Sequence, residues 1–220
     1  MSGKPLVSIG MPVYNGEPYL RESLDSLLGQ DYPNVEIVIA DNASTDGTAA
    51  MCAAYAARDA RVRYSRNPEN LGCVYSFNRV FTLSRGEYFM WAACDDRWAP
   101  GFVSKCSARL SEHSEAALCH VESRQMSMDG RPFDAPFSGL TATDPDPRVR
   151  WNRVLSDQRW HMAFYGMMRA SCLRRTGQMG EGFGSDLLLV AEMALQGTLV
   201  QVPEQLWWRK SKNHLRSCMY

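Results

Sequence analysis

The stretch from Tyr88 to Trp98, with the sequence YFMWAACDDRW, joins an apolar run to two adjacent carboxylates, Asp95 and Asp96. We interpret it as a buried strand that ends in these two acids. The carboxyl ends of strands in open α/β sheets border the crevice in which ligands bind. Two neighbouring carboxylates in such a crevice repel each other, and a hard cation such as Mg²⁺ or Mn²⁺ offsets that repulsion. Taken alone, the stretch fits equally well a loop that caps a helix starting near Ala99 and Pro100.

The chain before this stretch alternates short apolar runs with amphipathic segments. These patterns predict strands at residues 6–13, 35–40 and 62–65, and helices at residues 19–28, 49–58 and 74–84. Such alternation predicts an α/β fold with a mainly parallel central sheet. Right-handed crossovers then place helices on both faces of the sheet.

Polar residues follow each of the predicted strands. They are Tyr14-Asn15, Asp41-Asn42, Asn70 and Asp95-Asp96. Because parallel strands bring their carboxyl ends to one edge of the sheet, we expect these residues to form one composite site. The turn at residues 12–16 reads PVYNG, which argues against the Gly-x-Gly-x-x-Gly loop of dinucleotide folds. The sequence also lacks the glycine-rich P-loop pattern of nucleoside-triphosphatases.

The chain after Asp96 mixes further helices and strands with two irregular loops. The patterns predict helices at residues 102–113, 147–156, 170–175 and 185–195, and strands at 116–121, 162–168, 198–202 and 205–209. Residues 133–146 are rich in Pro, Asp, Gly, Ser and Thr and form the clearest internal boundary. Residues 176–184 form a glycine-rich loop.

The composition is that of a soluble globular protein. Among 220 residues, 24 are basic and 24 acidic, whereas binding of nucleic acid calls for a basic excess. No apolar run approaches the ~18 residues that cross a bilayer, and the amino terminus lacks the apolar region of a signal peptide. Peripheral contact with a membrane stays compatible with this composition. Seven scattered cysteines without Cys-x-x-Cys spacing predict reduced thiols and a cytoplasmic location.

Eight segments of the chain resemble, in order and in spacing, the sequence blocks of family 2 glycosyltransferases, which have the GT-A fold. They are residues 7–16, 36–48, 70–72, 86–89, 95–100, 165–169, 185–186 and 202–209. The resemblance implies an enzyme that moves a sugar from a nucleotide-diphosphate sugar to an acceptor hydroxyl. It also implies one GT-A domain over residues 1–220, with 1–122 as the donor-binding half and 123–220 as the acceptor-side half.

The resemblance assigns a donor site to the first loops. Pro12, Tyr14 and Glu17 would line the nucleoside pocket, with Tyr14 offering a flat apolar face. Asn70 would belong to the same donor pocket. Asp41 would accept a hydrogen bond from the ring N–H of the base, which favours a UDP-, GDP- or dTDP-sugar. The alternative for Asp41 is a turn or capping residue.

The resemblance also implies the chemistry. Asp95 would lie near the ribose and the metal, and Asp96 would ligate a Mg²⁺ or Mn²⁺ ion that neutralises the leaving diphosphate. Asp186 would be the general base for the acceptor hydroxyl, with inversion at the anomeric carbon. Its alternative is an N-cap, because Asp favours that position. Glu181 is the substitute candidate for the base.

The sequence departs from the family pattern at two places. Many members carry an acid where this chain has Ala93, so metal binding rests on fewer carboxylates; Cys94 beside it is expected in the core rather than as a ligand. Many members also place His two residues after an Arg equivalent to Arg209. Here Lys210, Lys212 and His214 follow, and they either reach the diphosphate or form a solvated basic tail.

Other readings stay open. Trp160 and His161 precede the strand expected to border the acceptor, and a core tryptophan beside a hydrogen-bonded histidine is favoured over a sugar-stacking pair. A non-catalytic nucleotide-sugar-binding module is the main alternative function. A sugar-phosphate nucleotidylyltransferase is less favoured, because its first loop would be glycine-rich. The acceptor would be a glycan, a lipid-linked glycan or a small molecule, in cell-surface polysaccharide or other glycan synthesis. The enzyme would be cytoplasmic or peripheral at the inner face of the membrane.

Overall fold

The computed structural model describes residues 3–127, 130–132 and 139–210 of the chain. Its strands are β1 (Val7–Val13), β2 (Val35–Asp41), β3 (Val62–Arg66), β4 (Tyr88–Trp91), β5 (Arg97–Trp98), β6 (Ala116–Met126), β7 (Met167–Arg169) and β8 (Thr198–Lys210). Its helices are α1 (Glu17–Leu28), α2 (Thr48–Arg58), α3 (Cys73–Leu83), α4 (Phe102–Glu112), α5 (Pro147–Ser156), α6 (Trp160–Phe164), α7 (Ala170–Leu173) and α8 (Ser185–Gln196).

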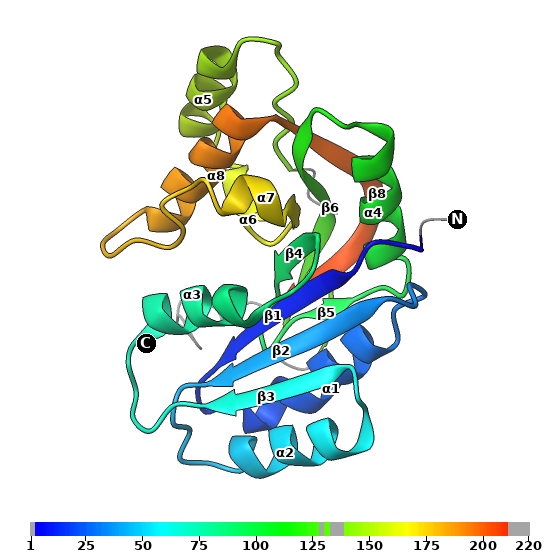
Figure 1. The fold of residues 1–220 in the computed structure, drawn as a ribbon, viewed down its shortest axis with the longest axis vertical. Coiled ribbons are helices and arrows are strands. Elements are labelled where there is room, and N and C mark those ends of the chain that lie inside the picture. Colours follow the sequence, from blue (N-terminus) through cyan, green and yellow to red (C-terminus); the bar gives the residue numbers. More distant parts are fainter. Residues whose placement is uncertain (1–2, 128–129, 133–138, 211–220) are drawn as a thin grey trace.

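The strands form one sheet in the order β3-β2-β1-β4-β7-β6-β8-β5. β1, β2, β3 and β4 pair in parallel, as do β6 and β8, whereas β7 and β5 pair antiparallel to their neighbours. In Figure 1, β1–β3 lie with α1–α3 at one end of the molecule and α5–α8 gather at the other. The predicted α/β fold with a mainly parallel sheet is confirmed.

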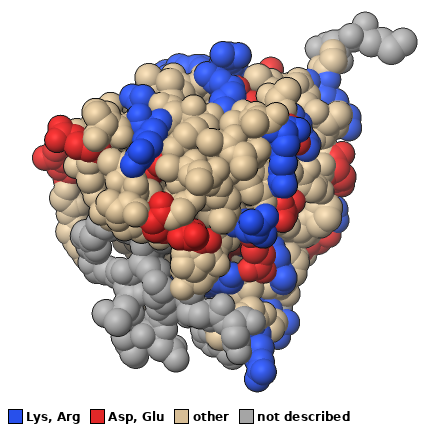
Figure 2. Space-filling model, turned by 90° about the horizontal axis from the view of Figure 1, so that it is seen from below, with Lys and Arg blue, Asp and Glu red and all other residues tan. Residues whose placement is uncertain are grey.

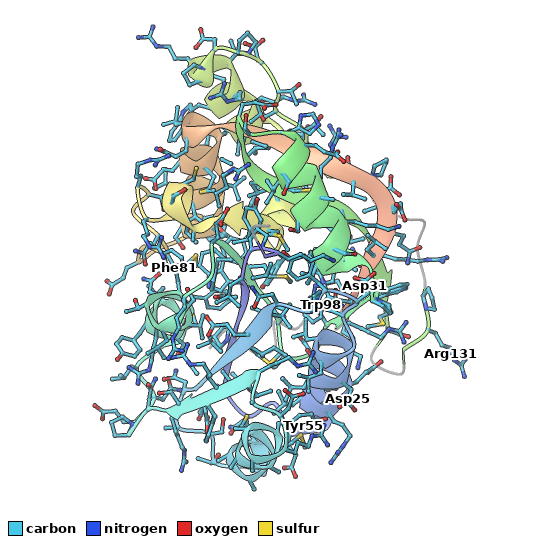
Figure 3. All side chains as sticks on the ribbon, turned by 45° about the vertical axis from the view of Figure 1, so that its right-hand side comes forward. Asp25, Asp31, Tyr55, Phe81, Trp98 and Arg131 are labelled. Atoms are coloured by element: carbon cyan, nitrogen blue, oxygen red, sulfur yellow. The ribbon has the colours of Figure 1, made fainter. Side chains whose placement is uncertain are left out.

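Two apolar cores cover the two faces of this sheet. Alternate strand residues divide between them, so that Tyr88 and Met90 of β4 join one core and Phe89 and Trp91 join the other. Helices α1, α2 and α4 cover the first face, and α3, α5, α6, α7 and α8 cover the second. The helices on one face also bind each other: the Tyr55 hydroxyl of α2 donates a hydrogen bond to Asp25 of α1 at 2.6 Å (Figure 3).

The stretch from Tyr88 to Trp98 forms two strands rather than one. β4 ends at Trp91, the two acids occupy a turn, and β5 then pairs with β8. The acids do not cap the next helix, because α4 begins at Phe102 with Gly101 as its N-cap. The capping interpretation of the pair is therefore wrong.

Two predictions for the second half of the chain are also wrong. The strand expected at residues 162–168 is helix α6 followed by the short strand β7, because an apolar run this short does not distinguish a buried helix from a strand. The two strands expected at 198–202 and 205–209 are one strand, β8. It continues through Pro203 because the pairing with β6 shifts register there, and such a bulge does not need the missing N–H.

Candidate active site

The loops after β1 and β2 are locked together at the carboxyl edge of the sheet. The backbone N–H of Asn15 donates to Ser44 Oγ at 2.9 Å, and the backbone N–H of Thr45 donates to Asn15 Oδ1 at 2.8 Å. Asn15 has a left-handed backbone with φ of 51°, which Asn tolerates better than most residues. Glu17 adds a third link, because its Oε2 accepts from the Gly47 backbone N–H at 2.8 Å.

A shallow pocket opens beside these loops. It is lined by Pro12, Val13, Tyr14, Asn42, Asn70, Cys73, Ser76 and Phe77, and it encloses about 290 Å³ of empty space, part of it open to solvent. Three residues of the predicted nucleoside site, Pro12, Tyr14 and Asn70, therefore lie together. Glu17 and Asp41 do not line this pocket.

Asp41 lies beneath the loops with no solvent exposure. Its Oδ1 accepts from the backbone N–H of Ser44 at 2.8 Å, which is the turn role weighed as an alternative. Its Oδ2 accepts from the Tyr64 hydroxyl at 2.9 Å and lies 3.3 Å from Arg66 Nε. Burial and the hydrogen bond to Asp41 raise the pKa of Tyr64. The side chain of Arg66 is 49% exposed.

The two adjacent acids are nearly buried, with Asp95 9% and Asp96 3% exposed. Asp96 is bound from β8: its Oδ2 accepts from Trp207 Nε1 at 2.9 Å and its Oδ1 from the Lys210 backbone N–H at 3.1 Å. Burial, and next the charge of Asp95, raise the pKa of Asp96 well above its usual range. Cys94, 1% exposed, packs in the first core as expected.

The acid pair fits a divalent cation whose remaining ligands come from the donor. Within residues 3–127, 130–132 and 139–210, no three His, Cys, Asp or Glu side chains group as a metal site. Two carboxylates are available, and each oxygen of Asp96 accepts one N–H, which leaves lone pairs for a cation. Because its pKa is raised, the charged form of Asp96 is destabilised by its surroundings, and a cation would stabilise that form. The phosphates of a donor would supply the other ligands.

Asp186 is the second residue of α8. The N-cap is Gly184, whose φ of 81° is left-handed, so the interpretation of Asp186 as the N-cap is wrong. Its Oδ1 accepts from the neighbouring backbone N–H of Leu187 at 2.9 Å. An acid in the first turn is also stabilised by the helix dipole. Glu181 lies in the loop before the helix and is exposed.

The hydroxyl of Tyr165, between α6 and β7, is influenced by the charges of three acidic residues. Burial, and then the charges of Asp96 and Asp95, raise the pKa of its hydroxyl. Asp186 raises this pKa as well, whereas Arg209 lowers it. The acid pair, the end of β8 and the start of α8 therefore all lie within electrostatic reach of one hydroxyl.

The pKa of His161 is shifted by some of the same charged groups. Burial lowers its pKa, Arg209 lowers it further, and Asp186 raises it. Its Nδ1 lies 2.7 Å from the carbonyl oxygen of Gln158, and Trp160 packs against the second core. The favoured interpretation of a core tryptophan beside a hydrogen-bonded histidine agrees with these contacts.

Sequence reasoning missed two residues of this site and gave a third no specific role. Tyr165 and Trp207 lie in segments that resemble the family, but nothing in the pattern gave them a role, whereas Asn42 was expected only as one of the polar residues at the sheet edge. Lys210 does not lie in a solvated tail, because its ammonium pairs with Glu22 and its side chain is 5% exposed; its contact with the diphosphate stays a prediction. Lys212 and His214 lie outside the described residues.

The surface shows no single-sign field on the face drawn in Figure 2, where Lys and Arg are interspersed with Asp and Glu. This distribution agrees with the neutral composition and gives no support to a nucleic-acid interface. In the part of the chain that the structure describes, no helix is both long and apolar enough to cross a bilayer.

The fold is that of a glycosyltransferase domain, as comparisons with known proteins show. The model of the family "Glycosyl transferase family 2" matches residues 8–172, more than half of the chain, which therefore belongs to this family. β8 and Asp186 lie beyond the matched residues.

Individual proteins are similar over parts of their length. The chain is 32% identical over 131 residues to the putative teichuronic acid biosynthesis glycosyltransferase TuaG of Bacillus subtilis, which covers 60% of this chain and 52% of TuaG. Residues 1–349 of S. aureus TarS, solved with UDP-GlcNAc, superpose with a TM-score of 0.76 at 19% identity over 96% of this chain and 60% of that one. The mannosyltransferase PcManGT of Pyrobaculum calidifontis, solved with GDP-Man and Mn²⁺, gives 0.69 at 18% identity over 97% of this chain and 59% of that one.

These comparisons confirm the predicted GT-A fold. The chain spans about half of the length of TuaG and about three fifths of each of the two solved chains.

Proposed function

We propose that the chain transfers a sugar from a nucleotide-diphosphate sugar to an acceptor hydroxyl, with inversion at the anomeric carbon. One observation carries the proposal: Asp95 and Asp96, between β4 and β5, and Asp186, at the start of α8, lie on separate elements, and the charge of each raises the pKa of the same Tyr165 hydroxyl. Inverting transfer needs this division, because the leaving diphosphate and the attacking hydroxyl lie on opposite sides of the sugar.

The donor occupies the edge of the sheet that ends in Pro12, Tyr14 and Asn70. Tyr14 supplies a flat apolar face for the base or the ribose. Asp41 accepts the ring N–H of the base once the half-exposed Arg66 moves aside, and Glu17 acts by holding the second loop in place. TarS is solved with UDP-GlcNAc and PcManGT with GDP-Man, so a UDP-, GDP- or dTDP-sugar is the expected donor class.

Asp95 and Asp96 hold a Mg²⁺ or Mn²⁺ ion. When bound, the ion neutralises the charge that develops on the leaving diphosphate. PcManGT, which has the same fold, is solved with Mn²⁺, and this supports a divalent cation as the cofactor. Ala93 leaves only two carboxylates, so we expect the cation to bind well only together with the nucleotide.

Asp186 takes the proton of the acceptor hydroxyl. The freed oxygen attacks the anomeric carbon, the bond from that carbon to the diphosphate oxygen breaks, and the nucleoside diphosphate leaves with the bonding electrons. A base on α8 suits this role because a glycine-rich loop, residues 176–184, precedes it and lets an acceptor approach. Glu181 of that loop is the reserve base.

The acceptor is a glycan, a lipid-linked glycan or a small molecule, and the name of TuaG supports cell-surface polysaccharide synthesis. The described cysteines Cys52, Cys73, Cys106, Cys119 and Cys172 are free thiols, which fits the reducing cytoplasm. Peripheral contact with the inner face of the membrane would bring a lipid-linked acceptor to this site.

A thermal-shift screen of UDP-, GDP- and dTDP-sugars, with and without Mn²⁺, tests the donor site. We expect one nucleotide class to raise the melting temperature, and Mn²⁺ to increase the shift. Donor-site assignment fails if no nucleotide stabilises the chain.

Asp186→Asn then separates catalysis from binding. We expect transfer to fall by about 10²–10⁴-fold while nucleotide binding is unchanged, because the amide cannot take the proton. Glu181→Gln is the matched control and should retain most of the transfer. A wild-type chain that binds the donor without turnover would instead support the non-catalytic binding module, which Ala93 favours.

A further inference from the structure

The orientation of Asp96 is fixed by two hydrogen bonds from strand β8. Trp207 Nε1 donates to Asp96 Oδ2 at 2.9 Å, and the Lys210 backbone N–H donates to Asp96 Oδ1 at 3.1 Å. Asp96 is 3% exposed and Trp207 1% exposed. Buried hydrogen bonds of this kind hold their partners strongly, because neither group can turn to water instead.

The Trp207 indole is itself held on several sides. In the sheet, Trp207 lies opposite Trp98 of β5 and opposite Ser123 of β6. The ring of Tyr165 packs against the indole, with ring centroids 5.2 Å apart. The direction of the indole N–H is therefore set by the sheet and by Tyr165, and Asp96 must conform to it.

These contacts restrict the Asp96 carboxylate without exhausting it. A carboxylate has about four lone-pair positions, and β8 occupies one on each oxygen. The remaining positions are free to face a cation shared with Asp95. Outer hydrogen-bond partners commonly orient metal-binding carboxylates in this way.

We propose that Trp207 is a positioning residue for the divalent cation: its indole N–H holds the Asp96 carboxylate in the orientation in which it binds the metal. The proposal rests on the cation role given above to Asp95 and Asp96. It extends the cation site to a strand that lies beyond residues 8–172, the part matched by the family model.

Trp208 provides a matched control within the same strand. Side chains alternate between the faces of a strand, so Trp208 points away from the side of Trp207. Its ring lies under the guanidinium of Arg97, at 5.0 Å from the ring centroid. Replacing Trp208 by Phe removes an indole N–H from β8 and leaves the contacts of Asp96 in place.

The test measures Mn²⁺ binding to the full chain by electron paramagnetic resonance of the free ion, with Mn²⁺ alone and with UDP or GDP added. Trp207→Phe should weaken Mn²⁺ binding by about 10–100-fold, the usual effect of losing an outer hydrogen-bond partner of a ligand. Trp208→Phe should bind Mn²⁺ like the wild type. Metal-free nucleotide binding should change little in Trp207→Phe, whereas the urea midpoint should fall, because Phe retains an aromatic ring but leaves Asp96 Oδ2 without its buried donor. Equal Mn²⁺ affinity of Trp207→Phe and the wild type overturns the proposal.

A measurement on the wild type serves where Trp207→Phe does not fold. The indole ¹⁵N–H signal of Trp207 should shift on addition of Mg²⁺ with UDP or GDP, whereas the indoles of Trp151 and Trp160 should not. An unmoved Trp207 signal on saturation with Mg²⁺ overturns the proposal.

These results are distinct from those that test transfer itself. Sugar transfer by a wild type that binds no Mn²⁺ overturns the role of Trp207 and leaves the proposed transfer standing. No transfer, together with a Mn²⁺ affinity that Trp207→Phe lowers, supports the role of Trp207 and contradicts the proposed transfer.

Discussion

At the scale of single residues, Asn42 is the amide that holds the second and third loops of the site together. Its Nδ2 donates to Asn70 Oδ1 and to the Gly72 carbonyl oxygen. Its Oδ1 accepts from Asn67 Nδ2 and from the Leu71 backbone N–H, each at 2.9 Å. The side chain is 4% exposed, so both donors and both acceptor positions are used inside the protein. One residue thus shapes the wall of the predicted nucleoside pocket.

Replacing Asn42 by Asp should destabilise the fold by about 1–3 kcal/mol. The new carboxylate oxygen would face Asn70 Oδ1 and the Gly72 carbonyl without a proton to share, and a buried unsatisfied group costs about that much. Urea denaturation measures the change in the free energy of unfolding, and nucleotide binding should weaken with it. Asn34→Asp is the control, because the exposed Asn34 amide donates only to the Lys4 carbonyl among its described contacts. A loss no larger than that of Asn34→Asp would contradict the structural role of Asn42.

The sequence located this loop but could not rank its residues. Family resemblance pointed to Asp41, which the structure buries against Tyr64, and gave no role to its neighbour Asn42. The difference lies in contacts with residues about 25–30 positions away, such as Asn67 and Asn70. Local patterns place polar residues at a sheet edge, but only packing decides which of them face a ligand.

At the scale of elements, the connection from α5 to α6 depends on one carboxylate. Asp157 accepts from the Arg159 guanidinium through both oxygens, at 2.9 and 2.6 Å, and Arg153 NH2 lies 3.1 Å away. The hydrogen bonds from Arg159 come first among the causes that lower the pKa of Asp157 to about 2. This clasp fixes the start of α6, which leads to His161 and Tyr165.

The lowered pKa of Asp157 predicts a pH-dependent contribution to stability. The unfolded carboxyl titrates near ~3.9, so the contribution is complete above that pH and is lost as the pH falls towards about 2. Asp157→Asn should therefore lower the free energy of unfolding by about 1 kcal/mol at pH 6, a value reduced by the half-exposed arginines.

The difference between Asp157→Asn and the wild type should shrink between pH 4 and pH 2, as measured by urea denaturation across this range. Asp59 forms a similar ion pair with Arg61 at the end of α2. Asp59→Asn is therefore a control for removing such a pair away from the binding site. A difference independent of pH would show that the clasp does not act through the charge of Asp157.

The elements of the first half were predictable because each repeats a simple pattern. Buried strands such as β2, with all seven residues buried, stand out as continuous apolar runs, and the intervening helices show one apolar face. The second half was less so. Met162, Ala163 and Phe164 are apolar in either a helix or a strand, and only tertiary packing distinguishes the two. In the structure they form α6, and Phe164 stacks on the Trp91 indole with ring centroids 5.0 Å apart.

At the scale of the whole molecule, the sheet runs without interruption through both proposed halves. β4 of the donor-binding half pairs with β7, and β7 pairs with β6, so the second half is joined to the first in mid-sheet. Among the described residues, Tyr165 packs against both apolar cores. The described residues of the two halves therefore share one sheet, and a single domain over residues 1–220 stays a prediction.

We expect the chain to unfold in one cooperative transition. Tryptophan fluorescence reports mainly on the second half and the middle of the sheet, whereas far-UV circular dichroism reports on all helices. Because the cores on the two faces share the same strands, both signals should give the same urea midpoint. Two separated midpoints would show that residues 1–122 and 123–220 fold independently. Trp208→Phe, which leaves the cores intact, should give coincident midpoints as well.

The bulge at Pro203 has a consequence for how this site tolerates change. β8 advances five residues, from Val202 to Trp207, while β6 advances two, from Val121 to Ser123. An odd excess inverts the alternation of side chains, so that Val202 and Trp207 both pack in the first core despite their odd spacing. Inserting or deleting one residue in this segment would preserve the strand. It would, however, move a neighbouring residue into the position from which the Trp207 indole binds Asp96. The number of residues between Val202 and Trp207 thus determines which face of the sheet the Trp207 side chain occupies.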